Sequence, residues 1–327
     1  MWQSSAPVVH LAASCRDGVP AGERHAGERQ QLGRQTSGCD VVVPRISPQL
    51  RMRCNATAEG RSWLSGLPGV IRDLSARWSL SVGAAFCGND ASCAWVAEVR
   101  RADGSRAVLK VALPHFEGRD EIAGLRFWSA DPTVRLLDAN EAIGAMLLER
   151  CEPGTALRLL PEPEQDLVIS GLLRRLWRTP PPTHAFRPIS AMLTYWIDEA
   201  RAEEPGHADT GLTRTALAVL PELLRPTTTD VLLATDLHAG NVLRAQREPW
   251  LVIDPKPFVG DAAYDATQHL LNCGARLASD PEAVVQRLAE LLDLDAGRVR
   301  LWTFVRAAIQ TDEFFGDTSK LARALAP

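Results

Sequence analysis

The sequence has 327 residues, 46% of them hydrophobic, so the chain can bury a substantial core and form one to three compact domains. Its formal net charge is −4, and no block of lysine and arginine is long enough to follow a phosphate backbone, which argues against a nucleic-acid partner. It has no run near the roughly 18 apolar residues of a membrane span and no apolar centre of a secretion signal, so we expect a cytoplasmic protein with no membrane partner. Its seven cysteines include no Cys-x-x-Cys pair, so we expect free thiols.

Residues 1–51 are expected to form a disordered leader. They contain five glycines, four prolines and five serines, with no sustained pattern apart from residues 40–45. Met52 is an alternative start of the protein, in which case the leader would be an upstream extension of the reading frame. The leader carries six arginines and four acidic residues, which leaves a net charge of −6 on residues 52–327. The remaining body is therefore more acidic than the whole chain.

One amphipathic helix and three strands are predicted next. Apolar residues recur at steps of three and four over residues 61–78, which is typical of one helix face, and we expect Pro68 to interrupt this helix. Three alternating runs follow, separated by turn signals. They span residues 80–86, 93–100 and 107–113. Three successive antiparallel strands predict a small sheet.

Lys110 lies in the middle of the third predicted strand, among apolar neighbours. The chain has only three lysines among its 36 basic residues, so arginine is its usual cation and this lysine indicates a specific role. A lysine buried in a strand is costly unless its charge has a partner, and Glu121 on the following predicted helix, residues 120–128, is the obvious one. Asp120 is an alternative partner. A lysine that extends to solvent from an edge strand is the alternative structure.

Two more strands and a helical half complete the predicted architecture. Residues 134–139 and 145–151 are predicted strands, and the Pro-Gly pair at 153–154 ends the second. The predicted helices that follow span residues 164–178, 189–203, 210–224, 262–277, 281–292 and 297–314. We therefore expect an α+β chain with an N-terminal part, residues 52–150, and a mostly helical C-terminal part, residues 151–327.

Three oxygen-bearing side chains follow two short predicted strands in the C-terminal part. Asp236 and Asn241 come after the apolar run 231–233, and Asp254 follows the run 250–253. A step of five from Asp to Asn is typical of the kinase catalytic loop, and an Asp after the next strand is where kinases hold magnesium. Magnesium prefers one or two hard protein oxygens together with phosphate oxygens. Capping or turn formation would explain each aspartate singly, but not the combined spacing.

Three stretches carry a family resemblance. They are Thr235-Asp236-Leu-His-Ala-Gly-Asn241-Val-Leu, Ile253-Asp254-Pro-Lys and Gly260-Asp261-Ala-Ala-Tyr264-Asp265. Together they resemble the aminoglycoside phosphotransferase family, in particular its streptomycin 6-phosphotransferase and hydroxyurea phosphotransferase branch. The resemblance covers about residues 60–327 and implies a protein-kinase-like two-lobed fold, with a small antiparallel-sheet N-lobe and a mostly helical C-lobe. One departure is that Ala234-Thr235 stands where the broader family has His-Gly, so the loop is expected to be braced differently.

The resemblance implies an ATP-dependent kinase of small molecules that uses magnesium. Asp236 would accept the proton of the attacking hydroxyl, and Asn241 and Asp254 would hold the metal ion. Lys110, paired with Glu121, would anchor the phosphates that are not transferred.

Two further segments are implied in nucleotide binding. Gly83 lies in the first hairpin, where kinases fold a glycine-containing loop over the phosphates. The chain lacks the Gly-x-Gly-x-x-Gly pattern of that loop, so a plain hairpin is the alternative. Glu149 and Cys151 lie in the segment 147–151, where the family's hinge joins the lobes and its backbone binds adenine. The resemblance implies this location and no particular side-chain contacts.

The implied acceptor is a cationic aminocyclitol, with streptomycin at its 6-hydroxyl as the leading candidate. Unpaired carboxylates would attract its guanidinium groups, and we name Asp198, Glu199 and Asp261 as candidates. Asp261 and Asp265 open a predicted helix, so capping and loop bracing are the alternative interpretation for both.

Several alternatives remain open at this point. Hydroxyurea or another small metabolite is an alternative acceptor, and a nucleotide-binding regulator without catalysis is a second alternative. The protein could be a monomer or a homodimer. We expect His238 to make a local hydrogen bond, and Lys256 to contact phosphate or pair with an aspartate.

Overall fold

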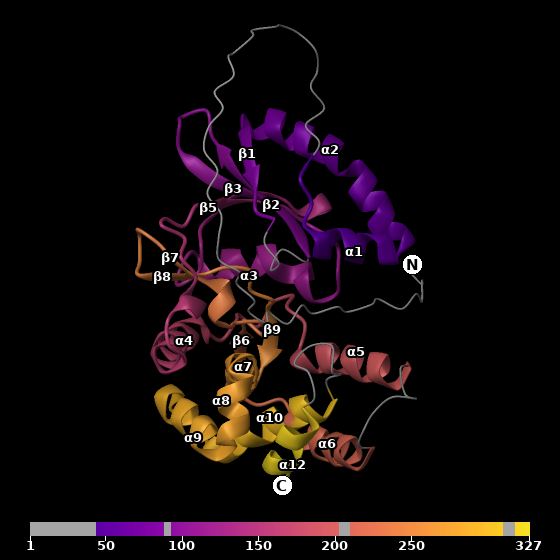
Figure 1. Cartoon of the computed structure of the whole chain (residues 1–327), viewed down its shortest axis with the longest axis vertical. Helices are drawn as coiled ribbons and strands as arrows, with labels where there is room; N and C mark the ends of the chain where they lie inside the picture. Colours follow the sequence, from indigo (N-terminus) through magenta and orange to yellow (C-terminus); the bar gives the residue numbers. More distant parts are fainter. Residues whose placement is uncertain (1–43, 88–92, 203–209, 310–317) are drawn as a thin grey trace, which may run out of the picture.

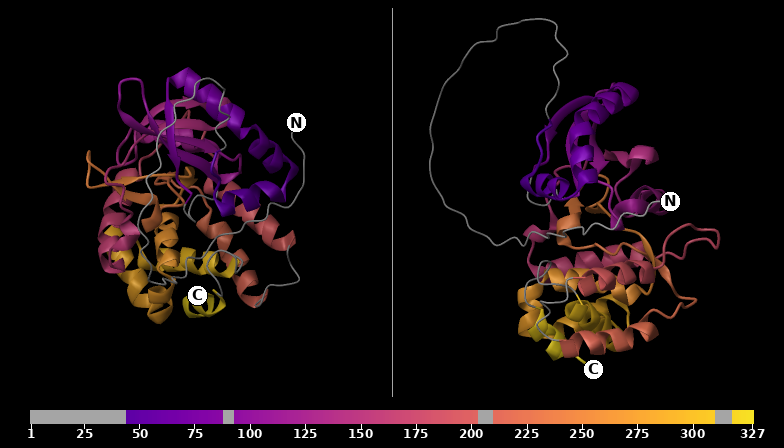
Figure 2. Two further views of the ribbon diagram at one scale, coloured as in Figure 1. Left: turned by 45° about the horizontal axis from the view of Figure 1, so that its top comes forward. Right: turned by 90° about the vertical axis from the view of Figure 1, so that its right-hand side faces the viewer.

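The computed structural model describes residues 44–87, 93–202, 210–309 and 318–327. These residues form two lobes, one built on a sheet and one mostly helical, which are stacked along the long axis of the molecule (Figure 1). In both turned views the sheet and its long N-terminal helix lie over the helical lobe (Figure 2). This is the predicted two-lobed α+β arrangement. No helix in the described ranges is long and apolar enough to cross a membrane.

In the part that the structure describes, the sheet lobe contains five strands and three α-helices. Its helices are α1 (Pro48–Ala56), α2 (Ala58–Trp78) and α3 (Glu121–Trp128), and its strands are β1 (Ser81–Ala85), β2 (Ala94–Arg100), β3 (Arg106–Ala112), β4 (Leu136–Asn140) and β5 (Ala145–Glu149). The strands pair antiparallel in the order β1-β2-β3-β5-β4. Side chains alternate along β3, so Leu109 and Val111 face α2 while Val108 and Lys110 face α3. This register decides which helix Lys110 can reach.

The folded part begins earlier than predicted. Helix α1 begins at Pro48, where Ser47 Oγ accepts a hydrogen bond from Leu50 N at 3.1 Å. Leu50 is 1% exposed and belongs to the core beneath α2. The predicted leader boundary at residue 51 is therefore wrong, because an N-cap and a buried leucine already lie within that stretch; residues 1–43 lie outside the described part.

Helix α2 is continuous, so the predicted interruption at Pro68 is also wrong. Its sheet-facing side buries Leu67, Ile71 and Leu74 against side chains of β2 and β3. Burying one such side chain stabilises the fold by about 1.5–3 kcal/mol, whereas a proline inside a helix costs about 3 kcal/mol. The three contacts together therefore outweigh the proline.

The helical lobe surrounds a central helix, α7. Its helices are α4 (Glu162–Leu176), α5 (Ile189–Ala202), α6 (Thr210–Leu223), α7 (Ala262–Asn272), α8 (Gly274–Ser279), α9 (Pro281–Leu292), α10 (Ala296–Ile309) and α12 (Ser319–Leu325). Strand β6 (Val231–Leu233) pairs with β9 (Phe258–Gly260), and β7 (Val242–Arg244) pairs with β8 (Trp250–Val252). Residues 263–271 of α7 are all buried.

The described part of the helical lobe departs from the prediction in one helix break and in three additional elements. The helix predicted over residues 262–277 is broken at Cys273, which ends α7. Strands β7 and β9 and helix α12 were not predicted. The last predicted helix corresponds to α10, and residues 310–317 lie outside the described part.

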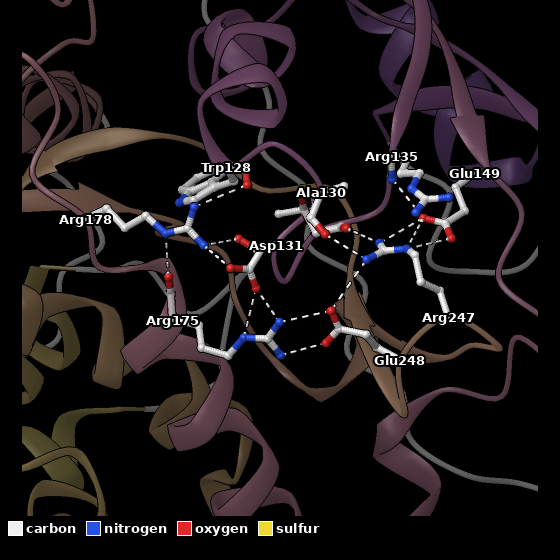
Figure 3. A network of polar contacts seen from close by, with 10 residues as sticks. Trp128, Ala130, Asp131, Arg135, Glu149, Arg175, Arg178, Arg247 and Glu248 are labelled. Carbon is white, nitrogen blue, oxygen red and sulfur yellow. Dashed lines mark hydrogen bonds and ion pairs between the residues drawn. The ribbon is translucent and has the colours of Figure 1, made fainter.

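A network of arginines and carboxylates joins the two lobes (Figure 3). Arg247, between β7 and β8, donates to Glu149 on β5 at 3.0 Å and to two main-chain carbonyls of segment 130–133 at 2.9 Å. On α4, Arg175 donates to Asp131 at 2.9 Å. The network therefore ties β5 and the α3–β4 connection to elements of the helical lobe.

We expect Arg247→Met to lower the free energy of unfolding by about 2 kcal/mol, because two carbonyls lose this donor and the Glu149 carboxylate keeps only the main-chain N–H of Arg135. The Arg247 and Glu149 side chains are 20% and 16% exposed, so water compensates only in part. Urea unfolding measures the change. Arg72→Met is the matched control, since Arg72 and its partner Asp73 are 71% and 77% exposed, and it should change stability by less than about 0.5 kcal/mol. Equal losses in both variants would contradict the expectation.

Candidate functional site

The loop after β6 carries Asp236 and is held by a buried carboxylate from α7. Asp265 Oδ1 accepts a hydrogen bond from Thr235 N at 2.7 Å, and its Oδ2 accepts one from Ala234 N at 2.9 Å. Burial raises the pKa of Asp265 to about 6. Thr235 has φ +46°, which is strained for a β-branched residue, and its hydroxyl donates to Lys256 O at 2.6 Å. The interpretation of Asp265 as a loop brace is confirmed.

Five charged side chains form a continuous row next to this loop, in the order Glu121, Lys110, Asp254, Lys256 and Asp236. Lys110 Nζ lies 2.6 and 2.7 Å from the two Glu121 oxygens and 2.6 Å from Asp254 Oδ1. Lys256 Nζ lies 3.9 Å from Asp254 Oδ2 and donates to Asp236 Oδ2. We call this the charged row. It brings four predicted site residues together with one lysine, and their charges alternate in sign.

Charge pairing outweighs burial at three members of the row, which are Lys110, Lys256 and Asp254. Burial disfavours the ammonium form, yet Asp254 and Glu121 raise the pKa of Lys110 above its ordinary value. Burial likewise opposes the charge of Lys256, but Asp236 and Asp254 raise its pKa. Burial disfavours the ionised form of Asp254, and the two ammonium groups nevertheless hold its pKa below the ordinary value. Glu121 is the exception, because its burial raises its pKa to about 7 even though Lys110 lowers it.

Asn241 ends a short 3₁₀ helix, η5 (Ala239–Asn241), beside the charged row. Its Nδ2 donates to Asp236 O at 3.0 Å, which leaves Oδ1 as an acceptor, and its main-chain oxygen accepts from Ile253 N at 2.9 Å. The described residues contain no group of three His, Cys, Asp or Glu side chains that could hold a metal ion. An ion held by Asn241 and Asp254 would thus need additional oxygens, which fits magnesium bound together with phosphates.

Helix α3 carries Glu121 and is fixed by two close contacts. A Cβ on Gly124 would lie 2.9 Å from the Pro257 ring, so the approach of α3 to the segment after β8 requires glycine here. At the end of the helix, Trp128 is fully buried in the core of the helical lobe, and its Nε1 donates to a carbonyl at the end of α4 at 2.9 Å. These contacts place Glu121 against the sheet.

Comparison with known proteins identifies the family. Residues 77–314 match the model of the aminoglycoside/hydroxyurea antibiotic resistance kinases. The chain belongs to this family. It is 37% identical over 259 residues to streptomycin 6-kinase from Streptomyces griseus, covering 76% of this chain and 83% of that protein. It is 36% identical over 275 residues to hydroxyurea phosphotransferase from Kitasatospora aureofaciens, covering 82% of this chain and 79% of that protein.

The fold of this resistance kinase is also found in solved kinase structures. The choline kinase LicA from Streptococcus pneumoniae superposes with a TM-score of 0.55 over 79% of this chain and 97% of that one, at 12% sequence identity. At that identity the likeness concerns the fold alone. It confirms the predicted protein-kinase-like architecture.

Three predicted nucleotide-binding residues of the kinase lie outside the charged row. Gly83 is at a register shift between β1 and β2, where a Cβ would lie 3.2 Å from Glu98 O. The Glu149 carboxylate is engaged by Arg247 (Figure 3). Cys151 is buried, which raises the pKa of its thiol to about 11. Contact of these residues with a nucleotide stays a prediction, and at the hinge it would come from the main chain.

The residues predicted to bind the acceptor lie in different surroundings. Asp261 caps α7 by accepting from Ala263 N at 3.0 Å, and its Oδ2 also accepts from Arg298 and Trp302, both at 2.5 Å. The capping interpretation is confirmed, and contact of Asp261 with an acceptor stays a prediction, since three protein donors already share this carboxylate. Asp198 lies exposed on α5, outside the charged row. The side chain of Glu199, also on α5, lies outside the described part.

Two residues that contact Asp236 were missing from the predicted catalytic set. Lys256 was expected only to touch phosphate or pair with an aspartate, and it pairs with Asp236. Gln268 was not singled out, yet its Nε2 donates to Asp236 Oδ1 at 2.9 Å. The feature that points to Gln268 is the burial of α7 on all sides, because each polar residue in such a helix needs a partner. Gln268 also lies three positions after Asp265 and so on the same face of the helix. The local hydrogen bond predicted for His238 is confirmed, since its Nδ1 accepts from the main chain at 3.1 Å.

We expect Asp265→Asn to lower the free energy of unfolding by about 2 kcal/mol, because the new NH₂ group faces a main-chain N–H where a carboxylate oxygen accepted before. Urea unfolding measures the change. Asp280→Asn is the matched control: Asp280 caps α9 through Ala283 N at 3.1 Å, and asparagine caps equally well, so the change should stay below about 0.5 kcal/mol. A stable Asp265→Asn variant would show that the loop does not depend on this brace.

Proposed function

We propose that this kinase transfers the γ-phosphoryl group of ATP, with magnesium, to a hydroxyl of an aminocyclitol antibiotic, and that the acceptor is streptomycin at its 6-hydroxyl. The observation that carries the proposal is the charged row, in which a buried lysine contacts an aspartate suited to magnesium, and a second lysine, Lys256, lies between that aspartate and one suited to act as a base. The similarity to streptomycin 6-kinase supports the choice of acceptor.

In this proposal ATP is held by Lys110, with Glu121 as its fixed partner on α3. Lys110 is 7% exposed, so its ammonium is poorly hydrated and attracts phosphate strongly. Lys256 would contact the phosphates from the other side of Asp254. Magnesium, held by Asn241 and Asp254, would neutralise charge on the phosphates and keep them aligned.

The chemical step then needs little covalent work by the protein. The acceptor oxygen attacks the γ-phosphorus, its proton passes to Asp236, and the bond to the β–γ bridging oxygen breaks, so that its electron pair leaves with ADP. Asp236 accepts one hydrogen bond on each oxygen from the protein. Because each carboxylate oxygen has two lone pairs, capacity remains for the acceptor hydroxyl.

Hydroxyurea is the second candidate acceptor, favoured by the 36% identity to hydroxyurea phosphotransferase over 275 residues. It is small and neutral, so it would not need the carboxylates that attract a guanidinium group. Both acceptors would use the same nucleotide-binding residues. The choice between them therefore depends on acceptor assays and not on the charged row.

We expect the protein, given ATP and magnesium, to add the mass of one phosphoryl group to streptomycin, with NMR placing it on the 6-hydroxyl. Asp236→Asn should abolish this transfer and retain ATP binding, because it removes the base while leaving the phosphate contacts in place. Asp293→Asn is the control, since this exposed residue has φ +59° at the end of α9, a conformation that asparagine adopts readily.

Three outcomes would count against this proposal. Phosphorylation of hydroxyurea alone would move the acceptor assignment to the second candidate. Full turnover by Asp236→Asn would remove Asp236 as the base. ATP binding without transfer to any acceptor in a wide panel would favour a regulator.

We expect Lys110→Met to weaken ATP binding by about tenfold or more, because a hydrogen bond to a charged group contributes about 1.5–3 kcal/mol. Calorimetry measures the affinity, and thermal unfolding shows whether the variant is folded. Lys320→Met is the matched control: it removes one of the three lysines at an exposed position on α12 and should leave affinity unchanged. Unchanged ATP binding in folded Lys110→Met would contradict the proposed phosphate anchor.

A further inference from the structure

Gln268 connects Asp236 to a buried cation on α10. Its Nε2 donates to Asp236 Oδ1 at 2.9 Å, and its Oε1 accepts from Arg306 at 2.6 Å. Gln268 is 9% exposed and Arg306 is 1% exposed. The three side chains form a line from α10 through α7 to the loop after β6.

Arg306 determines which end of the Gln268 amide meets Asp236. A guanidinium group has donors and no acceptor, so it pairs with the amide oxygen and the NH₂ group must point the other way. Arg306 is itself held in place: it donates to Thr267 Oγ1 at 2.8 Å, and its guanidinium carbon lies 5.1 Å from the centre of the Tyr264 ring. The donor end of the amide is therefore directed at the carboxylate.

Asp236 is consequently held at both oxygens. Gln268 donates to Oδ1, and Lys256 donates to Oδ2. Two donors on different oxygens oppose rotation of the carboxylate about its Cβ–Cγ bond. The lysine also lies 3.9 Å from Asp254, and in the proposed function it contacts phosphate. Gln268 lies in the buried stretch 263–271 of α7, so it would remain on the base if the lysine turned to the nucleotide.

We propose that Gln268 is a positioning residue that fixes the orientation of the Asp236 carboxylate for proton acceptance, and that Arg306 acts on Asp236 through Gln268. The inference rests on the proposed function, in which Asp236 is the base. A preorganised base must be held within roughly 10–20° of its productive orientation, and a directed amide donor provides this. A purely structural amide would affect stability and leave turnover unchanged.

Gln268→Met removes both ends of the amide at nearly constant length. We expect kcat for streptomycin phosphorylation to fall roughly 10- to 100-fold, because a misplaced catalytic group costs up to about 100-fold. KM for ATP should not change, since the contacts of Lys110 are untouched. Crystal structures of the variant should show the Asp236 carboxylate rotated or in more than one orientation.

Two further variants keep the test informative if Gln268→Met folds poorly. Gln268→Glu retains an oxygen for Arg306 and replaces the donor to Asp236 by a carboxylate oxygen that repels it, so it should lose kcat, and thermal unfolding shows whether the variant is folded. Arg306→Met should also lower kcat, and the double variant with Gln268→Met should be no slower than Gln268→Met alone, because both changes act through one contact.

Gln165→Met is the matched control. Gln165 lies on α4, is 6% exposed and donates to Leu160 O at 2.7 Å, so the change removes a buried amide that does not contact Asp236. It should lower stability and leave kcat at the wild-type value.

The outcomes separate the two proposals. Wild-type kcat in folded Gln268→Met or Gln268→Glu, or an unrotated Asp236 carboxylate in both, would overturn the positioning role, and so would an equal fall of kcat in Gln165→Met. Additive losses in the double variant would remove Arg306 from it. If the wild-type protein transfers nothing to streptomycin while the carboxylate still rotates in Gln268→Met, the proposed acceptor fails, and the orientation of Asp236 by Gln268 stands and is tested by kcat with the acceptor that the panel identifies.

Discussion

The alternation of charge along the row from Glu121 to Asp236 is the constraint on which the rest of the structure depends. Taking a charged group out of water costs several kcal/mol, so two lysines that are 7% and 8% exposed are stable only with carboxylates on either side. The members of the row come from β3, α3 and the segments after β6 and β8. Their pairing therefore holds the two lobes in one relative position as well as forming the site.

Helix α7 supports the charged row through two of its polar side chains. This role explains why a helix that is buried on every side contains polar residues. Asp265 binds the backbone of the loop, and Gln268 binds the side chain of Asp236. Both contacts originate from one rigid element. Position and orientation of the proposed base are thus set together, because a shift of α7 would change both contacts at once.

Much of the site could be predicted from the sequence, and the limits have physical causes. The pairing of Lys110 with Glu121 follows from strand alternation and from the cost of a lone buried charge. The contact between Gln268 and Asp236 joins residues 32 positions apart on different elements, and no local pattern records such a contact. Strands β7 and β9 have three residues each, too few to show a period. At Pro68, local propensity was overridden by burial against the sheet.

Trp128 has a consequence for motion between the lobes. By sequence α3 belongs to the sheet lobe, yet its last residue is embedded in the core of the other lobe and hydrogen-bonded to the end of α4. The helix is thereby mechanically coupled to the helical lobe, and the sheet would have to slide over it whenever the lobes rotate apart. Such a shear would lengthen the contact between Glu121 and Lys110. The proposed phosphate anchor would then depend on how far the lobes are apart.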